Sequence, residues 1–170
     1  MSQPSIKSIR KSLIAEPGKS FKLKDRPTRH PEIFDDKDKA RASLEEDARA
    51  IDELQDRLYG EGSRSLLVVL QGMDTSGKSG VIRHVFAYTS PLGMQLEAFK
   101  GPSKRELAQD YLWRIHAAVP GKGKIGIFDR SHYEDVLVVK VREFAPKEAI
   151  KKRYDPVSYT HLTLPTIYSV

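Results

Sequence analysis

Ser65-Leu66-Leu67-Val68-Val69-Leu70-Gln71-Gly72-Met73-Asp74-Thr75-Ser76-Gly77-Lys78-Ser79 is the stretch of sequence that decides the fold. Its first part is a short, uninterrupted apolar run, which is typical of a fully buried strand in a parallel sheet. Its second part, residues 72–79, matches the phosphate-binding pattern G-x-x-x-x-G-K-S/T at every fixed position. A helical pattern follows from Lys78 to about Tyr88, so the motif lies between a strand and a helix, as its chemistry requires.

The spacing of this motif has a physical reason. Glycines let the backbone curl so that successive amides point into one concavity, and the following helix adds the positive end of its dipole. Lys78 can neutralise the outer phosphates, and the Ser79 hydroxyl can ligate Mg²⁺. The alternative is an ordinary glycine turn with a surface lysine, which the flanking strand and helix disfavour. The predicted phosphate-binding residues are Gly72, Thr75, Ser76, Gly77, Lys78 and Ser79.

Two carboxylates are candidates for metal binding. Asp74 lies inside the loop, where it would repel a phosphate unless a cation sits between them. It is therefore predicted to be a Mg²⁺ ligand or a base, and the alternative is a solvent-facing side chain. Asp129 ends the apolar run 125–128, and strand ends of an α/β sheet converge on one crevice. Its role is either Mg²⁺ coordination or capping of the next helix. Arg130 follows directly and could clamp a transferring phosphoryl group.

Other segments alternate between helix and strand. Leu44, Ala48, Ile51, Leu54 and Leu58 recur at helical spacing, and that helix is expected to end near Gly60 and Gly62. Residues 94–99 and 124–129 are expected to be strands. A capping box at Ser103 to Glu106 begins a helix whose one face carries Leu107, Tyr111, Ile115 and Ala118. Another helix is expected near His132. This order predicts an α/β fold with a parallel sheet between two helical layers.

Composition narrows the class of protein. The chain has no Cys and no apolar run near the ~20 residues of a membrane span, so we expect a cytoplasmic protein without a membrane partner. Eight Lys or Arg and two acidic residues fall within residues 1–30, which gives this segment a charge equal to the +6 of the whole chain. The segment is either an arm that attracts a polyanion or a solvated leader. A nucleic-acid partner would rest on this arm alone and is not predicted.

Further polar residues flank the predicted crevice. His132, Glu134 and Asp135 could bind an acceptor nucleotide, or the two acids could simply favour the positive end of the following helix. Lys100, Lys104 and Arg105 could line a track for a long anion, or form a solvated helix start.

Several separate blocks resemble the second polyphosphate kinase family, and they occur in the right order. They are Leu70-Gln71-Gly72-Met73-Asp74, Gly77-Lys78, Phe99-Lys100, Pro102-Ser103, Asp110-Tyr111-Leu112-Trp113-Arg114-Ile115-His116, Arg130-Ser131-His132-Tyr133-Glu134-Asp135-Val136-Leu137-Val138-Val139 and Lys152-Arg153-Tyr154-Asp155. The resemblance implies a phosphate-loop kinase fold of the thymidylate kinase type. It also implies Mg²⁺-dependent phosphoryl transfer between inorganic polyphosphate and AMP or ADP.

The resemblance also implies roles for individual residues. Catalytic roles fall to Asp74, Lys78, Asp129 and Arg130, with Asp74 and Asp129 near the metal, and Lys100 becomes a phosphate contact. Nucleotide binding is assigned to His132, Tyr133 and Glu134. Two positions depart from the family pattern. Family members usually lack a hydroxyl residue at the position of Ser79, and in the branch that accepts both AMP and ADP the position of Asp129 is often Asn.

We expect three segments: a basic extended arm at 1–34, a kinase core at 35–156 and a non-native tail at 157–170. Family members continue beyond Asp155 with a basic lid and further strands, so the resemblance implies a core incomplete at its C-terminus and an impaired or inactive chain. Two alternatives stay open, an ATP-dependent nucleoside monophosphate kinase and a non-catalytic nucleotide or polyphosphate-binding module. The sequence leaves the oligomeric state open, a homo-oligomer included.

Overall fold

The computed structural model describes residues 22, 34, 36–141, 147–148 and 150–153. The chain divides into two compact units, residues 1–46 and 47–170. The long helix α2, Lys37–Glu61, begins in the first unit and ends in the second, close to the predicted end at Gly60 and Gly62. The expected arm at 1–34 falls almost entirely outside the described residues, and the expected tail at 157–170 falls wholly outside them.

A parallel three-stranded sheet forms the centre of the second unit. Its strands are β1 (Leu66–Leu70), β2 (Met94–Ala98) and β3 (Ile125–Asp129), in the order β1-β3-β2. Between β1 and β2 the chain forms α3 (Lys78–Val85) and the short 3-10 turn η2 (Pro91–Gly93). Between β2 and β3 it forms α4 (Lys104–Leu107) and α5 (Trp113–Ala118), and α6 (Glu134–Val141) follows β3. The sequence prediction of parallel strands joined by helices is confirmed.

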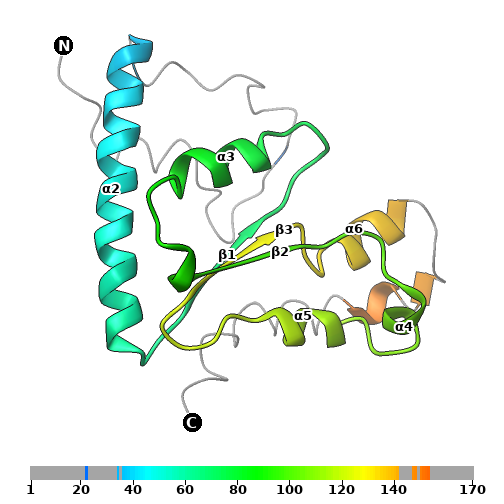
Figure 1. The fold of residues 1–170 in the computed structure, drawn as a ribbon. Coiled ribbons are helices and arrows are strands. Elements are labelled where there is room, and N and C mark those ends of the chain that lie inside the picture. Colours follow the sequence, from blue (N-terminus) through cyan, green and yellow to red (C-terminus); the bar gives the residue numbers. More distant parts are fainter. Residues whose placement is uncertain (1–21, 23–33, 35, 142–146, 149, 154–170) are drawn as a thin grey trace. The chain divides into compact units, whose positions relative to one another are not determined.

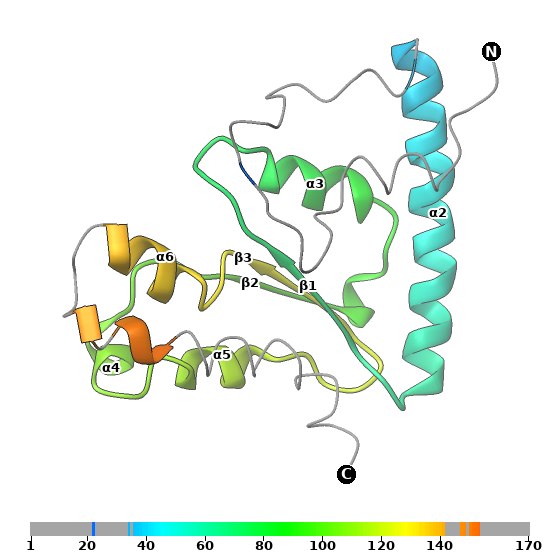
Figure 2. The same ribbon diagram turned by 180° about the vertical axis from the view of Figure 1, so that it is seen from behind.

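Helices cover both faces of this sheet. Figures 1 and 2 show α3 and α5 on opposite sides of the strands. The core on the α5 side consists of Phe99, Leu112, Ile115, Ala118 and Phe128. The Phe99 and Phe128 rings meet edge to face with centroids 4.8 Å apart. This aromatic contact anchors the end of β2 against β3, at the edge of the sheet where the candidate site lies.

The strands differ in burial. Residues 125–128 of β3 are all buried, because β3 has a strand on each side. The prediction that the β1 run would be fully buried is wrong: Leu66 is 50% exposed and the rest of β1 is half-buried. Within the described residues β1 pairs with β3 alone, so apolar composition predicted a strand correctly but not its place in the sheet.

The helix predicted from the capping box is divided in two. The box itself is confirmed, since Ser103 accepts from the Glu106 amide and Glu106 accepts from the Ser103 amide. The helix then stops, because the Asp110 carboxylate accepts a hydrogen bond from the Leu112 amide at 2.9 Å. Such a local bond competes with the helical backbone pattern. The expected single face is therefore lost, and Leu107 is 69% exposed.

The apolar face expected on α2 is also incomplete. Ala48 is buried, but Leu54 is 61% exposed. The other buried residue on α2 is Gln55, whose side chain accepts from the Ser90 amide at 3.1 Å. Gly93 lies so close to Gln55 that an added Cβ would overlap its amide. A hydrogen bond to a turn thus decides which side of α2 is buried.

None of the helices in the described part of the chain combines the length and apolar content needed to cross a membrane.

Candidate active site

The candidate site lies where the three strands end. Leu70, Asp129 and Ala98 are neighbours in the sheet register. Beyond them the Arg130 amide donates to the Leu70 carbonyl at 2.9 Å, and the Phe99 amide donates to the Asp129 carbonyl at 3.0 Å. The segments that follow β1, β2 and β3 therefore leave the sheet side by side, as expected for the carboxyl ends of parallel strands.

The phosphate loop, residues 71–77, joins β1 to α3. Gly77 has φ 92° and precedes Lys78, the first residue of α3, so a residue without a Cβ turns the chain into the helix. Thr75 has φ 64°, which is uncommon for a β-branched residue. Strained backbone of this kind is often found where a ligand binds. The side chains of residues 73–76 are exposed, which leaves the loop surface open to a ligand.

Lys78 lies across its own loop. Its Nζ donates to the carbonyl oxygens of Gly72 and Met73, both at 2.9 Å, and lies 3.5 Å from the Ser76 hydroxyl. These contacts hold the ammonium against the backbone of the loop. A phosphate would offer the ammonium charged oxygens in place of neutral carbonyls, and charge-assisted hydrogen bonds are the stronger kind.

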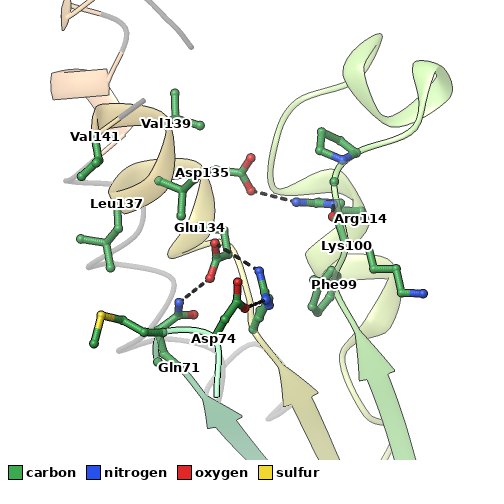
Figure 3. A pocket seen from close by; sticks show the side chains of 16 residues that line it. Gln71, Asp74, Phe99, Lys100, Arg114, Glu134, Asp135, Leu137, Val139 and Val141 are labelled. Atoms are coloured by element: carbon green, nitrogen blue, oxygen red, sulfur yellow. Dashed lines mark hydrogen bonds and ion pairs between the residues drawn. The ribbon is translucent and has the colours of Figure 1, made fainter. Parts of the chain in front are cut away.

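An ionic network connects the phosphate loop to the end of β3 (Figure 3). Arg130 has φ 68° and its Nη2 forms a short ion pair with Asp74, while its Nη1 lies 4.0 Å from Glu134. The carboxylate of Glu134 in turn accepts a hydrogen bond from the side-chain Nε2 of Gln71 at 2.6 Å. Asp74 is 85% exposed and Arg130 37% exposed, so both remain accessible to a ligand.

Asp129 lies apart from this network. Its Oδ1 is buried and has no hydrogen-bond partner among the described residues. Asp129 lines a small cavity of about 280 Å³ together with Ser79 and Arg83. A buried acceptor without a donor is costly, and a cation would satisfy it. Ser79 and Asp129 are hard oxygen donors of the kind that Mg²⁺ takes from proteins, so these residues fit the metal.

No cluster of three or more acidic or imidazole side chains suited to a metal occurs in the described ranges. This finding agrees with the way Mg²⁺ usually binds, through one or two carboxylates plus water and substrate phosphates.

A larger cavity, about 830 Å³, opens in front of the Asp74–Arg130 pair. Lys100 lines it from the segment after β2, and α6 contributes an apolar wall (Figure 3). In that wall Leu137 is 49% exposed and Val141 is 81% exposed. One end of the cavity is thus charged and suits phosphate, and the other is apolar and suits a flatter, less polar group.

The three residues predicted to bind nucleotide do not share one surface. Glu134 lines the large cavity, whereas neither His132 nor Tyr133 does. His132 is only 1% exposed, and its ring stacks on Tyr133 with centroids 4.7 Å apart. Burial raises the pKa of the Tyr133 hydroxyl. In this structure His132 is therefore buried and Tyr133 half-buried, and of the three residues Glu134 alone lines the large cavity.

Sequence reasoning did not single out Arg114, which the structure places in the cavity wall. Its guanidinium forms an ion pair with Asp135 at 3.2 Å, and both side chains are largely buried, with exposed fractions of 9% and 13%. Burial raises the pKa of Asp135, although Arg114 acts in the opposite direction. An arginine within a helical pattern gives no local signal of such a contact, because its partner lies 21 positions away.

Comparison with known proteins identifies a consistent set of relatives. The family model described as Polyphosphate kinase 2 (PPK2) matches residues 34–164. An AMP/ADP-polyphosphate phosphotransferase of Meiothermus ruber is 52% identical over 106 residues, which cover 62% of this chain and 40% of the relative. An ADP-polyphosphate phosphotransferase of Rhodopseudomonas palustris is 39% identical over 124 residues, covering 73% of this chain and 43% of the relative.

A solved structure has the same fold. The crystal structure of polyphosphate kinase 2 from Arthrobacter aurescens superposes with a TM-score of 0.77 at 39% identity, over 82% of this chain and 51% of that one. The chain thus spans about two fifths of the length of the two relatives named above and about half of this structure.

Proposed function

The chain belongs to the polyphosphate kinase 2 family, and on that premise we propose that its site transfers a phosphoryl group between inorganic polyphosphate and AMP or ADP. The observation that carries the proposal is the contact between the phosphate loop and the end of β3, where Asp74 of the loop that Lys78 contacts forms an ion pair with Arg130. The names of the two relatives support polyphosphate as the donor and an adenine nucleotide as the acceptor.

The reaction proposed is a direct exchange of bonds at phosphorus. An oxygen of the acceptor's last phosphate bonds to the terminal phosphorus of polyphosphate, and the bond from that phosphorus to the adjoining bridging oxygen breaks. Polyphosphate becomes one unit shorter, and AMP becomes ADP or ADP becomes ATP. Because the acceptor phosphate is already ionised, the step requires little proton transfer, and catalysis depends on position and charge.

Each part of the phosphate-loop side has a place in this scheme. Loop amides and Lys78 would bind the transferring phosphoryl group, with Lys78 exchanging the Gly72 and Met73 carbonyls for phosphate oxygens. Arg130 would stabilise the charge that develops during transfer. A phosphate that takes the guanidinium of Arg130 also releases Asp74 from its ion pair, which makes the Asp74 carboxylate available to a metal.

Mg²⁺ is proposed as the cofactor, held by Asp129 and Asp74 with Ser79 as a further oxygen donor. When bound, it neutralises phosphate oxygens and orients them for in-line transfer. The buried Asp129 oxygen without a donor supports this assignment on the β3 side. Because the acceptor phosphate is already ionised, the reaction needs no strong base. Metal binding is therefore the favoured role of Asp74, rather than proton abstraction.

Substrate binding follows from the shape of the larger cavity. Lys100 would contact the polyphosphate chain, since it stands exposed at the cavity edge. Glu134 would face the acceptor nucleotide, with His132 and Tyr133 supporting it from behind through the stacked pair. The apolar wall of α6 would accommodate the base.

The test is ATP formation from ADP and long-chain polyphosphate with Mg²⁺, compared with Lys78→Ala and with Lys122→Ala as the matched control. Lys122 is an exposed lysine just before β3, at the opposite end of that strand from Asp129. We expect Lys78→Ala to lower the rate by about 100-fold or more, and Lys122→Ala to leave it unchanged.

Two results would contradict the proposal. One is phosphoryl transfer that Lys78→Ala does not affect. The other is transfer from ATP to AMP without transfer from polyphosphate, which would identify a nucleoside monophosphate kinase. Binding of end-labelled polyphosphate to the same variants, read by fluorescence anisotropy, gives a second readout that needs no turnover, and there Lys78→Ala should abolish a signal that Lys122→Ala retains.

A further inference from the structure

Arg114 connects two walls of the large cavity. It lies on α5, and its side chain is only 9% exposed although the residue lines the cavity. Figure 3 shows it between Asp135 of α6 and the segment that carries Lys100. A guanidinium so thoroughly buried must have its donors satisfied by protein groups, and those partners indicate what it does.

The first partner is the backbone of Lys100. Arg114 Nη1 donates to the Lys100 carbonyl at 2.8 Å, and its guanidinium carbon lies 5.5 Å from the centre of the Phe99 ring. Phe99 is itself held by the hydrogen bond that its backbone N–H donates to the Asp129 carbonyl and by the contact with the Phe128 ring. Arg114 therefore fixes the backbone just after β2, at Lys100, whose side chain lines the large cavity.

The second partner is Asp135, in the first turn of α6. Arg114 Nη2 forms an ion pair with its carboxylate at 3.2 Å, and the backbone carbonyl of Asp135 accepts from Arg153 at 2.9 Å. Glu134, the neighbour of Asp135, belongs to the network that includes Arg130 and the phosphate loop. Arg114 therefore holds the backbone of Lys100 against α6, the helix that also carries Glu134.

A lysine at position 114 could not make both of these contacts. The guanidinium presents fixed, divergent donors that can serve a carbonyl and a carboxylate at the same time, whereas an ammonium is a point charge on a flexible stem. Nη1 and Nη2 of Arg114 each donate to a protein acceptor, so these contacts of the guanidinium serve the chain itself.

We propose that Arg114 is a positioning residue for polyphosphate binding, acting through Lys100, whose backbone it fixes against α6. The inference rests on the proposed function in one respect only, that Lys100 contacts polyphosphate. The statement that Arg114 holds the segment of Lys100 concerns the chain alone and can be tested without any ligand.

The first experiment is hydrogen exchange of the whole chain, followed by mass spectrometry, for the wild type, Arg114→Lys and Arg153→Lys. Arg153→Lys is the matched control, because Arg153 also contacts Asp135 but has no hydrogen bond to Lys100 among the contacts described. In Arg114→Lys we expect exchange in residues 99–103 to accelerate about tenfold, which corresponds to about 1.4 kcal/mol of lost protection. Arg153→Lys should leave that segment unchanged.

The second experiment is a double-mutant cycle on the dissociation constant for end-labelled polyphosphate, with Lys100→Ala, Arg114→Lys and the double variant. Each single change should weaken binding by about tenfold, the range of a charge-assisted hydrogen bond. In the Lys100→Ala background Arg114→Lys should have little further effect. Thermal unfolding of each variant separates this loss from a general loss of fold.

The outcomes distinguish the two proposals. Additive losses in the cycle would mean that Arg114 contacts polyphosphate directly, and unchanged exchange at residues 99–103 would mean that it does not hold Lys100. Either result overturns the inference while leaving the proposed function intact. A wild-type chain that fails to bind polyphosphate overturns the proposed function and the role assigned to Lys100, and the exchange experiment still decides whether Arg114 fixes that segment.

Discussion

The ends of β1 and β3 lie side by side in the sheet but are built in opposite ways. Beyond β1, the loop side chains are in solvent, with Met73 84% exposed and Asp74 85% exposed. Beyond β3, Ser131 is fully buried and His132 is 1% exposed. Both ends contain a residue with positive φ, Thr75 in the loop and Arg130 after β3.

The difference separates two tasks within one site. Ser131 and His132 make the β3 end a fixed template, because these two residues are enclosed by the core and cannot move without disturbing it. The β1 end is held by contacts that a phosphate can replace, namely the Lys78 bonds to carbonyls and the exposed pair of Asp74 with Arg130. Binding would therefore reorganise the loop against a template that stays in place.

The largest expected effect contrasts the two Arg–Asp pairs of the site. Asp135→Ala leaves the buried guanidinium of Arg114 without its carboxylate, which should cost about 3 kcal/mol of unfolding free energy. Asp74→Ala removes an exposed partner of Arg130 and should cost less than about 1 kcal/mol. Urea denaturation of both variants measures the difference, and equal losses would show that the loop side is as rigid as the β3 side.

Glycine replacements should differ in sign between the two sides. In Gly126→Ala the new Cβ would lie 2.6 Å from Cγ of Pro120, a rigid ring, so we expect a loss of about 1–3 kcal/mol. Gly80 lies in α3, just after the phosphate loop, with nothing within 4 Å of an added Cβ. Gly80→Ala should therefore stabilise the chain by about 0.5–1 kcal/mol. Melting temperatures of the two variants should move in opposite directions, and a parallel shift would contradict the contrast.

Features that depend on near neighbours in sequence were predictable. The phosphate loop, the capping box at Ser103 and the three strands follow from spacing and composition over a few residues. The contacts of Lys78 are equally local, because they run only to groups of its own loop, while its role toward phosphate stays a prediction.

Features that depend on distant partners were not predictable. β1 is more uniformly apolar than β3, yet β3 is the buried strand, because burial follows sheet order and a strand pattern contains no information on order. Gln55 is buried and forms a hydrogen bond with the backbone of Ser90. Arg114 is buried and forms hydrogen bonds with the Lys100 carbonyl and the Asp135 carboxylate. Each of these contacts becomes visible only once the chain has folded.

Relief of backbone strain should be a smaller effect, confined to the loop side. Thr75→Gly removes a β-branched side chain from a backbone with φ 64°, and we expect a gain of about 0.5–1 kcal/mol after the higher chain entropy of glycine is allowed for. Ser76→Gly is the matched control, since Ser76 does not have a positive φ and its replacement should bring no gain. A loss of stability in Thr75→Gly would mean that the loop conformation is not strained.

The smallest expected effect is a pH dependence on the β3 side. Burial raises the pKa of Asp135 above its unfolded value, so the folded chain binds that proton more tightly than the unfolded chain does. The stabilisation from this proton is complete below the unfolded pKa and is lost as the pH rises through the folded pKa. Relative to Asp135→Asn, the wild type should therefore become less stable as the pH rises from about 4, the unfolded pKa of an aspartate, toward neutrality. A wild type that instead gains stability over this range would show that Arg114 outweighs the burial of Asp135, and the β3 template would then owe its rigidity to charge rather than to packing.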